Sequence, residues 1–194
     1  MKNLKFSTAI VLLVLLTGTF QGCKKGENDP FLSFHSRDAR LAGDWEMTDV
    51  NSETTVTFTS TSNPTPVVNT STVTYANGEQ TMSGSTSKSR FNVDVKIEKN
   101  GQITMTLENF DSKGGSLGIT EERGYWVWGS TAKRKSTVVI TIKDIGGVSL
   151  NGVWNVDQLK NKEIIFKKTN YTKGSNSNST TESTGETTIT FKGK

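Results

Sequence analysis

The side chains best suited to acid–base chemistry in this chain are carboxylates that lie close together in the sequence. The closest are Glu121 with Glu122, Glu108 with Asp111, and Asp44 with Glu46. Two carboxyl groups can hydrolyse a glycosidic bond when one acts as a general acid and the other as a base or nucleophile. Neighbours on a β-strand point to opposite faces, however, and no pair here is flanked by a second acid or base. We therefore expect solvated surface charges and no enzyme activity.

Histidine and cysteine, which often serve as metal ligands and nucleophiles, occur once each, as His35 and Cys23. A single histidine cannot form a His-rich metal site, and no nucleophile beside it suggests a catalytic triad. The sequence also contains no Gly-rich phosphate loop, no nucleophile elbow and no HExxH zinc motif. It predicts neither a metal nor a cofactor, and it favours a surface or cap position for His35.

The first 22 residues are typical of a secretory signal peptide. Lys2 and Lys5 form a positive n-region, and residues 9–16 form an apolar run that is too short to span a bilayer as a helix. Cys23 follows directly after Gly22. This junction resembles the cleavage site of bacterial lipoproteins, in which the cysteine becomes the acylated first residue of the mature chain. A free cysteine after an ordinary signal peptide is the alternative.

The resemblance to a lipoprotein implies a lipid bilayer as one partner and the cell envelope as the location. Acyl chains such as palmitate on Cys23 would anchor the protein to the outer membrane, because two or more chains together bind a bilayer stably. Residues 23–30 then form a polar lipidated tether, since residues 24–29 carry no apolar side chain. The tether mixes positive and negative charges, so the periplasmic face and the cell surface both remain open.

The remaining segment, residues 31–194, has the composition of one all-β domain. A chain of 194 residues with 32% hydrophobic content suits a single core, and 18 Gly with only 3 Pro suit short strands joined by tight turns. The formal net charge is +4, and Lys2 and Lys5 of the signal segment contribute to it. The other lysines are scattered rather than clustered, so we expect no nucleic-acid partner.

Alternating apolar residues predict an antiparallel hairpin in the middle of this domain. Its apolar side chains are Phe91, Val93, Val95, Ile97, Ile103, Met105 and Leu107. Period two places all of them on one face of a strand pair, whereas a helix would not, and residues 99–101 form the turn. One buried face and one wet face are what an antiparallel sheet closed on itself requires.

Similar patterns predict the other elements of the domain. A short helix is expected over residues 31–41, and strands over 43–50, 53–60, 67–76, 80–87, 119–129, 138–142, 148–156 and 187–192, the last beside the first. Residues 174–185, rich in Ser, Asn and Thr, are expected to form a mobile hairpin loop. The strand around residue 126 is apolar on both faces. Trp126 and Trp128 either pack against other elements, which we favour, or form an exposed aromatic patch.

The segment Leu41-Ala42-Gly43-Asp44-Trp45 stands where the helix gives way to the first strand. It resembles the Leu-x-Gly-x-Trp motif of lipocalin-like bacterial lipoproteins, in which Gly43 would let the chain pass under a barrel floor and Trp45 would plug that floor. Residues 154–166 resemble the late segment of the same proteins, where a strand turns at Leu-x-Asn and returns as an apolar strand. The resemblance implies a lipocalin-like, antiparallel up-and-down β-barrel of about 8–10 strands with a short N-terminal helix.

Lipocalins also carry an arginine late in the barrel that stacks on the tryptophan of the first strand. No arginine follows Arg134 here. A lysine can replace it through a cation–π contact, and Lys167, Lys168 and Lys192 are the candidates.

A barrel of this size either holds one small ligand or fills itself with side chains. The resemblance implies a small hydrophobic ligand, and the residues predicted to line its cavity are Phe58, Tyr75, Phe91, Val93, Val95, Ile103, Met105, Leu107, Tyr125, Val127 and Ile140. The alternative is a structural or interaction subunit of a cell-surface assembly, with a filled barrel and an unknown protein partner. An open apolar cavity above the floor formed by Trp45 would distinguish the first from the second.

Overall fold

The computed structural model describes residues 36–129 and 135–194. The predicted signal peptide, Cys23, the tether and His35 lie outside the described residues. The elements are α2 (Arg37–Leu41), β1 (Gly43–Ser60), β2 (Val67–Ala76), β3 (Glu79–Met82), β4 (Ser89–Ile97), β5 (Gln102–Phe110), β6 (Ser116–Trp128), β7 (Thr137–Thr141), β8 (Gly152–Lys160), β9 (Glu163–Ser175) and β10 (Ser179–Gly193). No helix in this part of the chain is long and apolar enough to cross a membrane.

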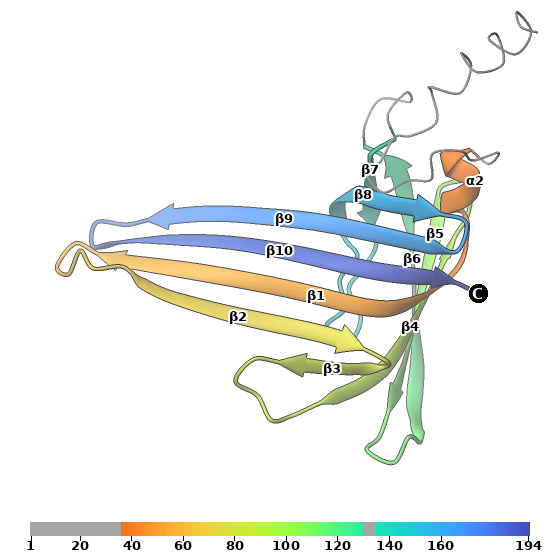
Figure 1. Ribbon diagram of the computed structural model, residues 1–194, viewed down its shortest axis with the longest axis horizontal. Coiled ribbons are helices and arrows are strands. Elements are labelled where there is room, and N and C mark those ends of the chain that lie inside the picture. The colour runs from red at the N-terminus through yellow and green to blue at the C-terminus, as the bar shows by residue number, and fades with distance from the viewer. Residues whose placement is uncertain (1–35, 130–134) are drawn as a thin grey trace, which may run out of the picture.

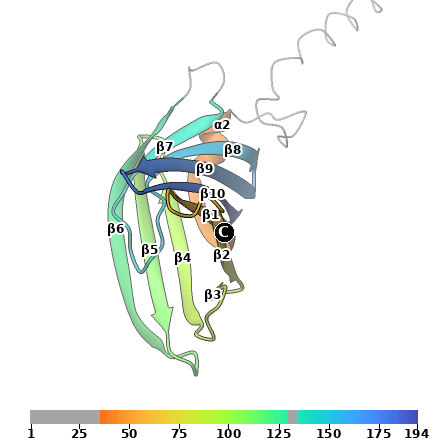
Figure 2. The ribbon, with the colours of Figure 1, turned by 90° about the vertical axis from the view of Figure 1, so that its left-hand side faces the viewer.

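The strands form a closed antiparallel barrel in the order β1-β10-β9-β8-β7-β6-β5-β4-β3-β2 (Figure 1). Consecutive strands from β2 to β10 are neighbours, and β10 returns to pair with β1. Figure 2, turned by 90° from Figure 1, shows β4, β5 and β6 side by side as one curved wall. The predicted all-β, up-and-down barrel and its closing strand are therefore confirmed.

Strand β1 shares one of its edges between two partners. Residues Gly43–Glu46 pair with β4, whereas Asp49–Phe58 pair with β2. The register with β10 shifts between Met47 and Asp49, so that Trp45 and Met47 face inward before the shift and Val50 faces inward after it. Two strands, over 43–50 and 53–60, were predicted where the chain forms one, because Asn51 and Ser52 continue the pairing with β10 and β2 without a break.

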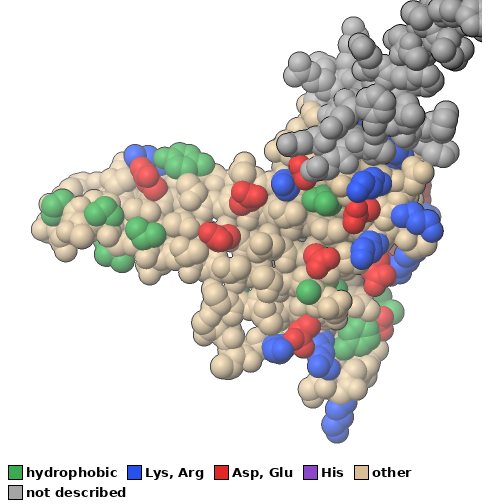
Figure 3. All heavy atoms as spheres, in the orientation of Figure 1, with side chains coloured by type: hydrophobic (Ala, Val, Ile, Leu, Met, Phe, Trp, Pro, Cys, Tyr) green, Lys and Arg blue, Asp and Glu red, His purple; other side chains and the backbone are tan. Residues whose placement is uncertain are grey.

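Four strands continue beyond the barrel as a long sheet that we call the arm (Figure 1). The arm consists of Glu53–Ser60 of β1, Val67–Thr72 of β2, Thr169–Ser175 of β9 and Ser179–Glu186 of β10. Most of its side chains are partly or fully exposed. Figure 3 shows that Lys and Arg side chains gather over the barrel body and are sparse on the arm.

The prediction of a hairpin loop over residues 174–185 is wrong, because most of these residues belong to the end of β9 and the first half of β10. Only residues 176–178 turn the chain, and the Asn176 side chain accepts hydrogen bonds from the backbone N–H groups of Asn178 and Ser179. Threonine has high β-propensity and pairs well across strands, so polarity here did not mean irregular backbone. The strand predicted over 80–87 is also shorter than expected, since β3 ends at Met82.

Helix α2 closes one end of the barrel. It covers only the last part of the predicted helix, and the segment before Ser36 lies outside the described residues. The Ser36 hydroxyl accepts from the Ala39 N–H and caps the helix. Leu41 is completely buried, and Arg40 donates to the carbonyl oxygen of Leu159 at the end of β8. The helix is thereby fixed against the barrel wall.

Gly124 in β6 marks a point of close approach between strands. A Cβ atom at this position would lie 2.1 Å from the carbonyl oxygen of Thr141 and 2.8 Å from the Cβ atom of Ile142.

Gly124→Ala is expected to lower the free energy of unfolding by about 1–3 kcal/mol, because the neighbouring backbone must move. Urea unfolding measures the change. Gly174→Ala, where nothing lies within 4 Å of the added methyl group, is the control and should leave stability unchanged. Equal stability of both variants would contradict the prediction.

Candidate functional site: a cavity at the open end of the barrel

The end of the barrel nearest α2 is filled with side chains. Trp45, Ile103, Leu150, Phe166 and Phe191 are among the residues that meet there, and they leave no room for a water molecule. The indole N–H of Trp45 donates to the carbonyl oxygen of Leu41 at 2.9 Å, so the tryptophan is packed and its polar atom is satisfied. No ligand can enter this half of the interior.

The opposite half opens into a cavity of about 500 Å³. It lies where β1, β2, β9 and β10 leave the barrel to form the arm, and the loop before β8 covers one side. Its lining residues are Met47, Val50, Ser52, Val73, Tyr75, Gln80, Met82, Phe91, Gly147, Val148, Ser149, Trp154, Lys168, Asn170, Thr187 and Ile189. The volume and the mainly apolar lining are those of a small-molecule pocket.

Two successive rows of side chains give the cavity a graded polarity. The deeper row crosses four strands and is apolar apart from one hydroxyl: Phe166, Ile189, Val50 and Tyr75. The next row toward the arm carries Lys168, Thr187, Ser52, Val73 and Met82. The hydroxyls of Ser52 and Thr187 lie 2.8 Å apart and hydrogen-bond to each other. The cavity is therefore apolar at depth and polar on one side of its rim.

Lys168 is held at this rim by two contacts. Its Nζ atom donates to the carbonyl oxygen of Asn151 at 3.2 Å and lies 5.5 Å from the centre of the Trp154 ring. A Cβ atom on Gly152 would come within 2.9 Å of that Nζ atom, so the glycine leaves space for the ammonium group. Lys167, Lys168 and Lys192 were the candidates for stacking on Trp45. Lys168 does stack on a tryptophan ring, but the ring is that of Trp154.

Trp154 belongs to a second Leu-x-Gly-x-Trp segment, Leu150-Asn151-Gly152-Val153-Trp154. Its indole N–H donates to the carbonyl oxygen of Leu150 at 2.8 Å, just as Trp45 donates to Leu41. Both leucines are completely buried. Sequence reasoning identified the first segment and missed the second, although the same spacing would have revealed it. It also missed Lys168 and Met47 as lining residues.

The residues predicted to line a cavity divide into four groups. Tyr75 and Phe91 line the open cavity, while Val95, Ile103 and Ile140 surround the filled end. Val93, Met105 and Leu107 are buried in the core but do not line the cavity. Phe58, Tyr125 and Val127 are exposed, by 41%, 68% and 61%, so their assignment to the interior is wrong.

The errors have two physical causes. Phe58 does lie on the sheet face that continues from the barrel interior, but it sits in the arm, where no opposite wall covers it. Strand β6 is apolar on both faces near residue 126, so alternation alone cannot tell which face is buried. Trp126 pairs with inward-facing Ile140 and fills the interior, which leaves Tyr125 and Val127 outside.

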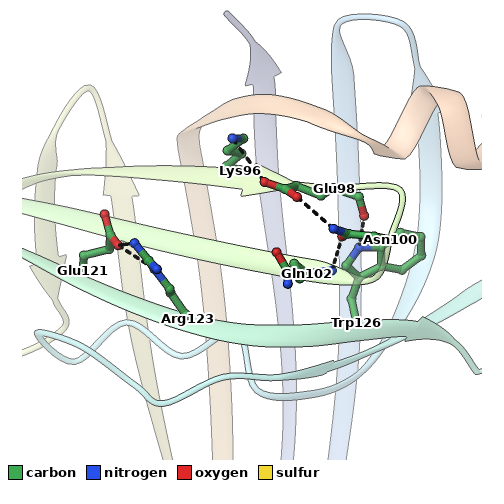
Figure 4. A network of polar contacts seen from close by, with 7 residues as sticks. All are labelled: Lys96, Glu98, Asn100, Gln102, Glu121, Arg123 and Trp126. Atoms are coloured by element: carbon green, nitrogen blue, oxygen red, sulfur yellow. Dashed lines mark hydrogen bonds and ion pairs between the residues drawn. The ribbon is translucent and has the colours of Figure 1, made fainter.

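Trp126 is also tied to the β4–β5 turn (Figure 4). Its indole N–H donates to the carbonyl oxygen of Glu98 at 2.8 Å. The Glu98 carboxylate lies 3.2 Å from the Lys96 ammonium and accepts from the Asn100 amide, and these two contacts lower the pKa of Glu98. The network anchors the tryptophan and does not reach the cavity.

The carboxylates considered as catalytic pairs lie away from the cavity. Glu121 pairs with Arg123 at 2.9 Å, as Figure 4 shows, and Glu122 pairs with Lys143 at 3.5 Å. Asp111 accepts hydrogen bonds from the backbone N–H groups of Lys113 and Gly115 in the β5–β6 turn. Within residues 36–129 and 135–194, no group of three or more His, Cys, Asp or Glu could hold a metal ion.

No protein-family model and no curated protein matches this chain.

Tyr75 makes the floor of the cavity sensitive to high pH. Its hydroxyl donates to the carbonyl oxygen of Phe91 at 3.0 Å, and the two rings stack with centres 5.0 Å apart. Burial, together with the nearby carboxylates of Glu46, Asp94 and Asp49, raises the pKa of Tyr75 to about 12. The unfolded chain loses this proton near its ordinary pKa of about 10, whereas the folded protein retains it. Stability should thus fall as the pH rises from about 10 to about 12.

The Tyr75→Phe variant tests this linkage. At pH 11 the wild-type protein is expected to have lost about 1.4 kcal/mol through Tyr75, and the variant should lack that loss. Urea unfolding at pH 9 and pH 11 measures the difference for each protein. Tyr125→Phe, at an exposed position, is the control and should behave as wild type. An unchanged pH dependence in Tyr75→Phe would contradict the assignment.

Proposed function

We propose that this protein is a membrane-anchored, lipocalin-like lipoprotein whose barrel binds a small hydrophobic ligand. The observation that supports ligand binding best is the cavity of about 500 Å³ at the open end of the barrel. A barrel that served only as a scaffold could pack both halves with side chains, as this one packs the half around Trp45. Apolar surface that faces an open cavity is instead available to a ligand.

The floor of the cavity suits an apolar molecule. Met47, Phe91, Trp154 and Ile189 contribute to its lining, and each of these side chains is almost completely buried. Burial of a ligand against such side chains removes apolar surface from water at about 25 cal/mol per Å². Tryptophan and methionine side chains are large and polarisable, which helps them to accommodate ligands of varied shape. The proposal is one of binding and requires no catalytic group.

Filling the cavity with a side chain tests the proposal. Val73 lines the cavity from β2, and Val73→Trp should occupy part of its volume. A neutral fluorescent probe such as N-phenyl-1-naphthylamine is expected to bind the wild-type protein. It should bind Val73→Trp at least tenfold more weakly, because the indole ring takes up space in which the probe would bury apolar surface. A tenfold loss of affinity corresponds to about 1.4 kcal/mol. Fluorescence titration measures both dissociation constants.

Val68→Trp is the matched control, since Val68 lies on the same strand but on the opposite, exposed face. This variant should bind the probe as the wild-type protein does. Failure of the wild-type protein to bind the probe, or equal binding by Val73→Trp, would contradict ligand carriage.

Membrane anchoring is the second part of the proposal, and it is supported by the signal-like N-terminus followed by Gly22-Cys23. Cys23→Ser removes the thiol that would be acylated. The variant is expected to move from the membrane fraction to the soluble fraction of its host, because acyl chains supply the membrane affinity. Immunoblotting of separated fractions measures the distribution, and Ser36→Ala, beyond the tether, is the control. Retention of Cys23→Ser in the membrane would refute the anchor.

The arm favours a second candidate function, that of an interaction subunit at the cell surface. It projects well beyond the barrel (Figure 1) and exposes Phe58, Val67 and Val68 near its end. Exposed apolar side chains of this kind can contact another protein. The two functions are compatible, because the cavity lies at the base of the arm and the exposed residues lie near its tip.

A further inference from the structure

We propose that the ligand of this cavity is an amphiphile with an apolar tail and one anionic head group, and that Lys168 contacts the head group. The inference rests on the proposed function, because it concerns the same cavity. It adds the chemical class of the ligand and the residue that selects it.

The charge of the cavity lining comes from one side chain. Lys168 is the only Lys, Arg, Asp or Glu among the described residues that line the cavity. Across residues 36–129 and 135–194, no carboxylate oxygen lies within 4.0 Å of its Nζ atom. Other lysines of the described residues do form ion pairs, as Lys167 does with Asp157 at 3.4 Å. The cavity thus presents a positive charge that the described protein does not neutralise.

The position of the ammonium group is restricted. One of its three N–H donors is used by the carbonyl oxygen of Asn151, and its charge lies over the Trp154 ring. Two donors remain for a ligand. A lysine side chain that is already oriented loses less conformational entropy when a ligand binds, so the contact favours binding more than a mobile surface lysine would.

The polarity gradient fixes how an amphiphile would lie. Lys168 and Thr187 occupy the row nearest the arm, and Ile189 lies one row deeper on the same face of β10 as Thr187. A tail directed toward Ile189, Met47 and Phe91 would leave its head group beside Lys168 and the paired hydroxyls of Ser52 and Thr187. A cationic head group would be repelled by the lysine, and a neutral one could accept a hydrogen bond from the ammonium group but would lack the attraction between opposite charges.

Three amphiphiles with twelve carbon atoms each test the head group on the purified protein. Isothermal titration calorimetry measures the binding of dodecanoate, dodecyl phosphate and 1-dodecanol, and acetate supplies the head group without a tail. At least one of the two anions is expected to bind about tenfold more tightly than the alcohol, which is the size of effect expected for a charge-assisted hydrogen bond. Acetate should show no binding. The preferred anion tells a carboxylate ligand from a phosphate ligand.

Two variants of adjacent lysines separate the head-group contact from general effects of charge. Lys168→Gln should lose the preference for the anion and retain the affinity for 1-dodecanol. Lys168→Arg should restore part of the preference. Lys167→Gln removes the same charge from the next residue of β9, which faces the outside of the barrel, and should behave as wild type.

The possible results distinguish this inference from the proposed function. Equal affinity of the wild-type protein for the alcohol and both anions would overturn the inference and leave the ligand-binding proposal standing. Binding of none of the three twelve-carbon compounds would overturn both. Loss of 1-dodecanol binding in Lys168→Gln, or an equal loss of anion preference in Lys167→Gln, would overturn the role of Lys168. Tight binding of acetate would overturn the need for a tail.

Discussion

Strand β1 pairs with β10 along nearly its whole length, but its other edge is divided between β4 and β2. This division shapes the molecule. Where β1 pairs with β4, through Gly43–Glu46, the wall is closed tightly and Trp45 fills the space inside. Where β1 pairs with β2 instead, β2 and β3 are inserted into the wall and the circumference grows. A wider barrel cannot be filled by the same side chains, so the cavity opens at this level.

The two Leu-x-Gly-x-Trp segments stabilise opposite parts of this arrangement. In each, the indole N–H bonds to the carbonyl oxygen four residues earlier, which fixes the ring where the chain enters a strand. Trp45 uses this geometry to fill the closed end, whereas Trp154 presents its ring to the cavity and to the ammonium group of Lys168. The same indole-to-carbonyl hydrogen bond therefore accompanies packing at one end and cavity lining at the other. The difference arises from whether neighbouring strands leave space beside the ring.

Local patterns were sufficient to predict much of the barrel from the sequence. The hairpin of β4 and β5 alternates cleanly because one face is buried and the other is wet, and the bounds of β2 match those expected. What could not be predicted depends on contacts between distant segments. The inward face of β6 is set by the pairing of Trp126 with Ile140, and the exposure of Phe58 is set by the absence of an opposing wall in the arm. The position of Lys168 beside Trp154 likewise follows from the pairing of β9 with β8 and not from spacing along the chain.

The arm raises the question of how a sheet with two wet faces remains folded. A sheet normally needs one hydrophobic face for stability, and most side chains of the arm are Thr, Ser, Asn, Lys or Glu. Cross-strand contacts such as the Thr55–Thr70 hydroxyl pair and the Lys173–Glu182 ion pair contribute only modestly. The main support must come from the base, where the same strands continue into the buried row that contains Phe166 and Ile189. The row of Lys168, Thr187 and Ser52 lies at the boundary between these two regions, and for that reason a charged side chain can reach a mainly apolar cavity there without being fully removed from water.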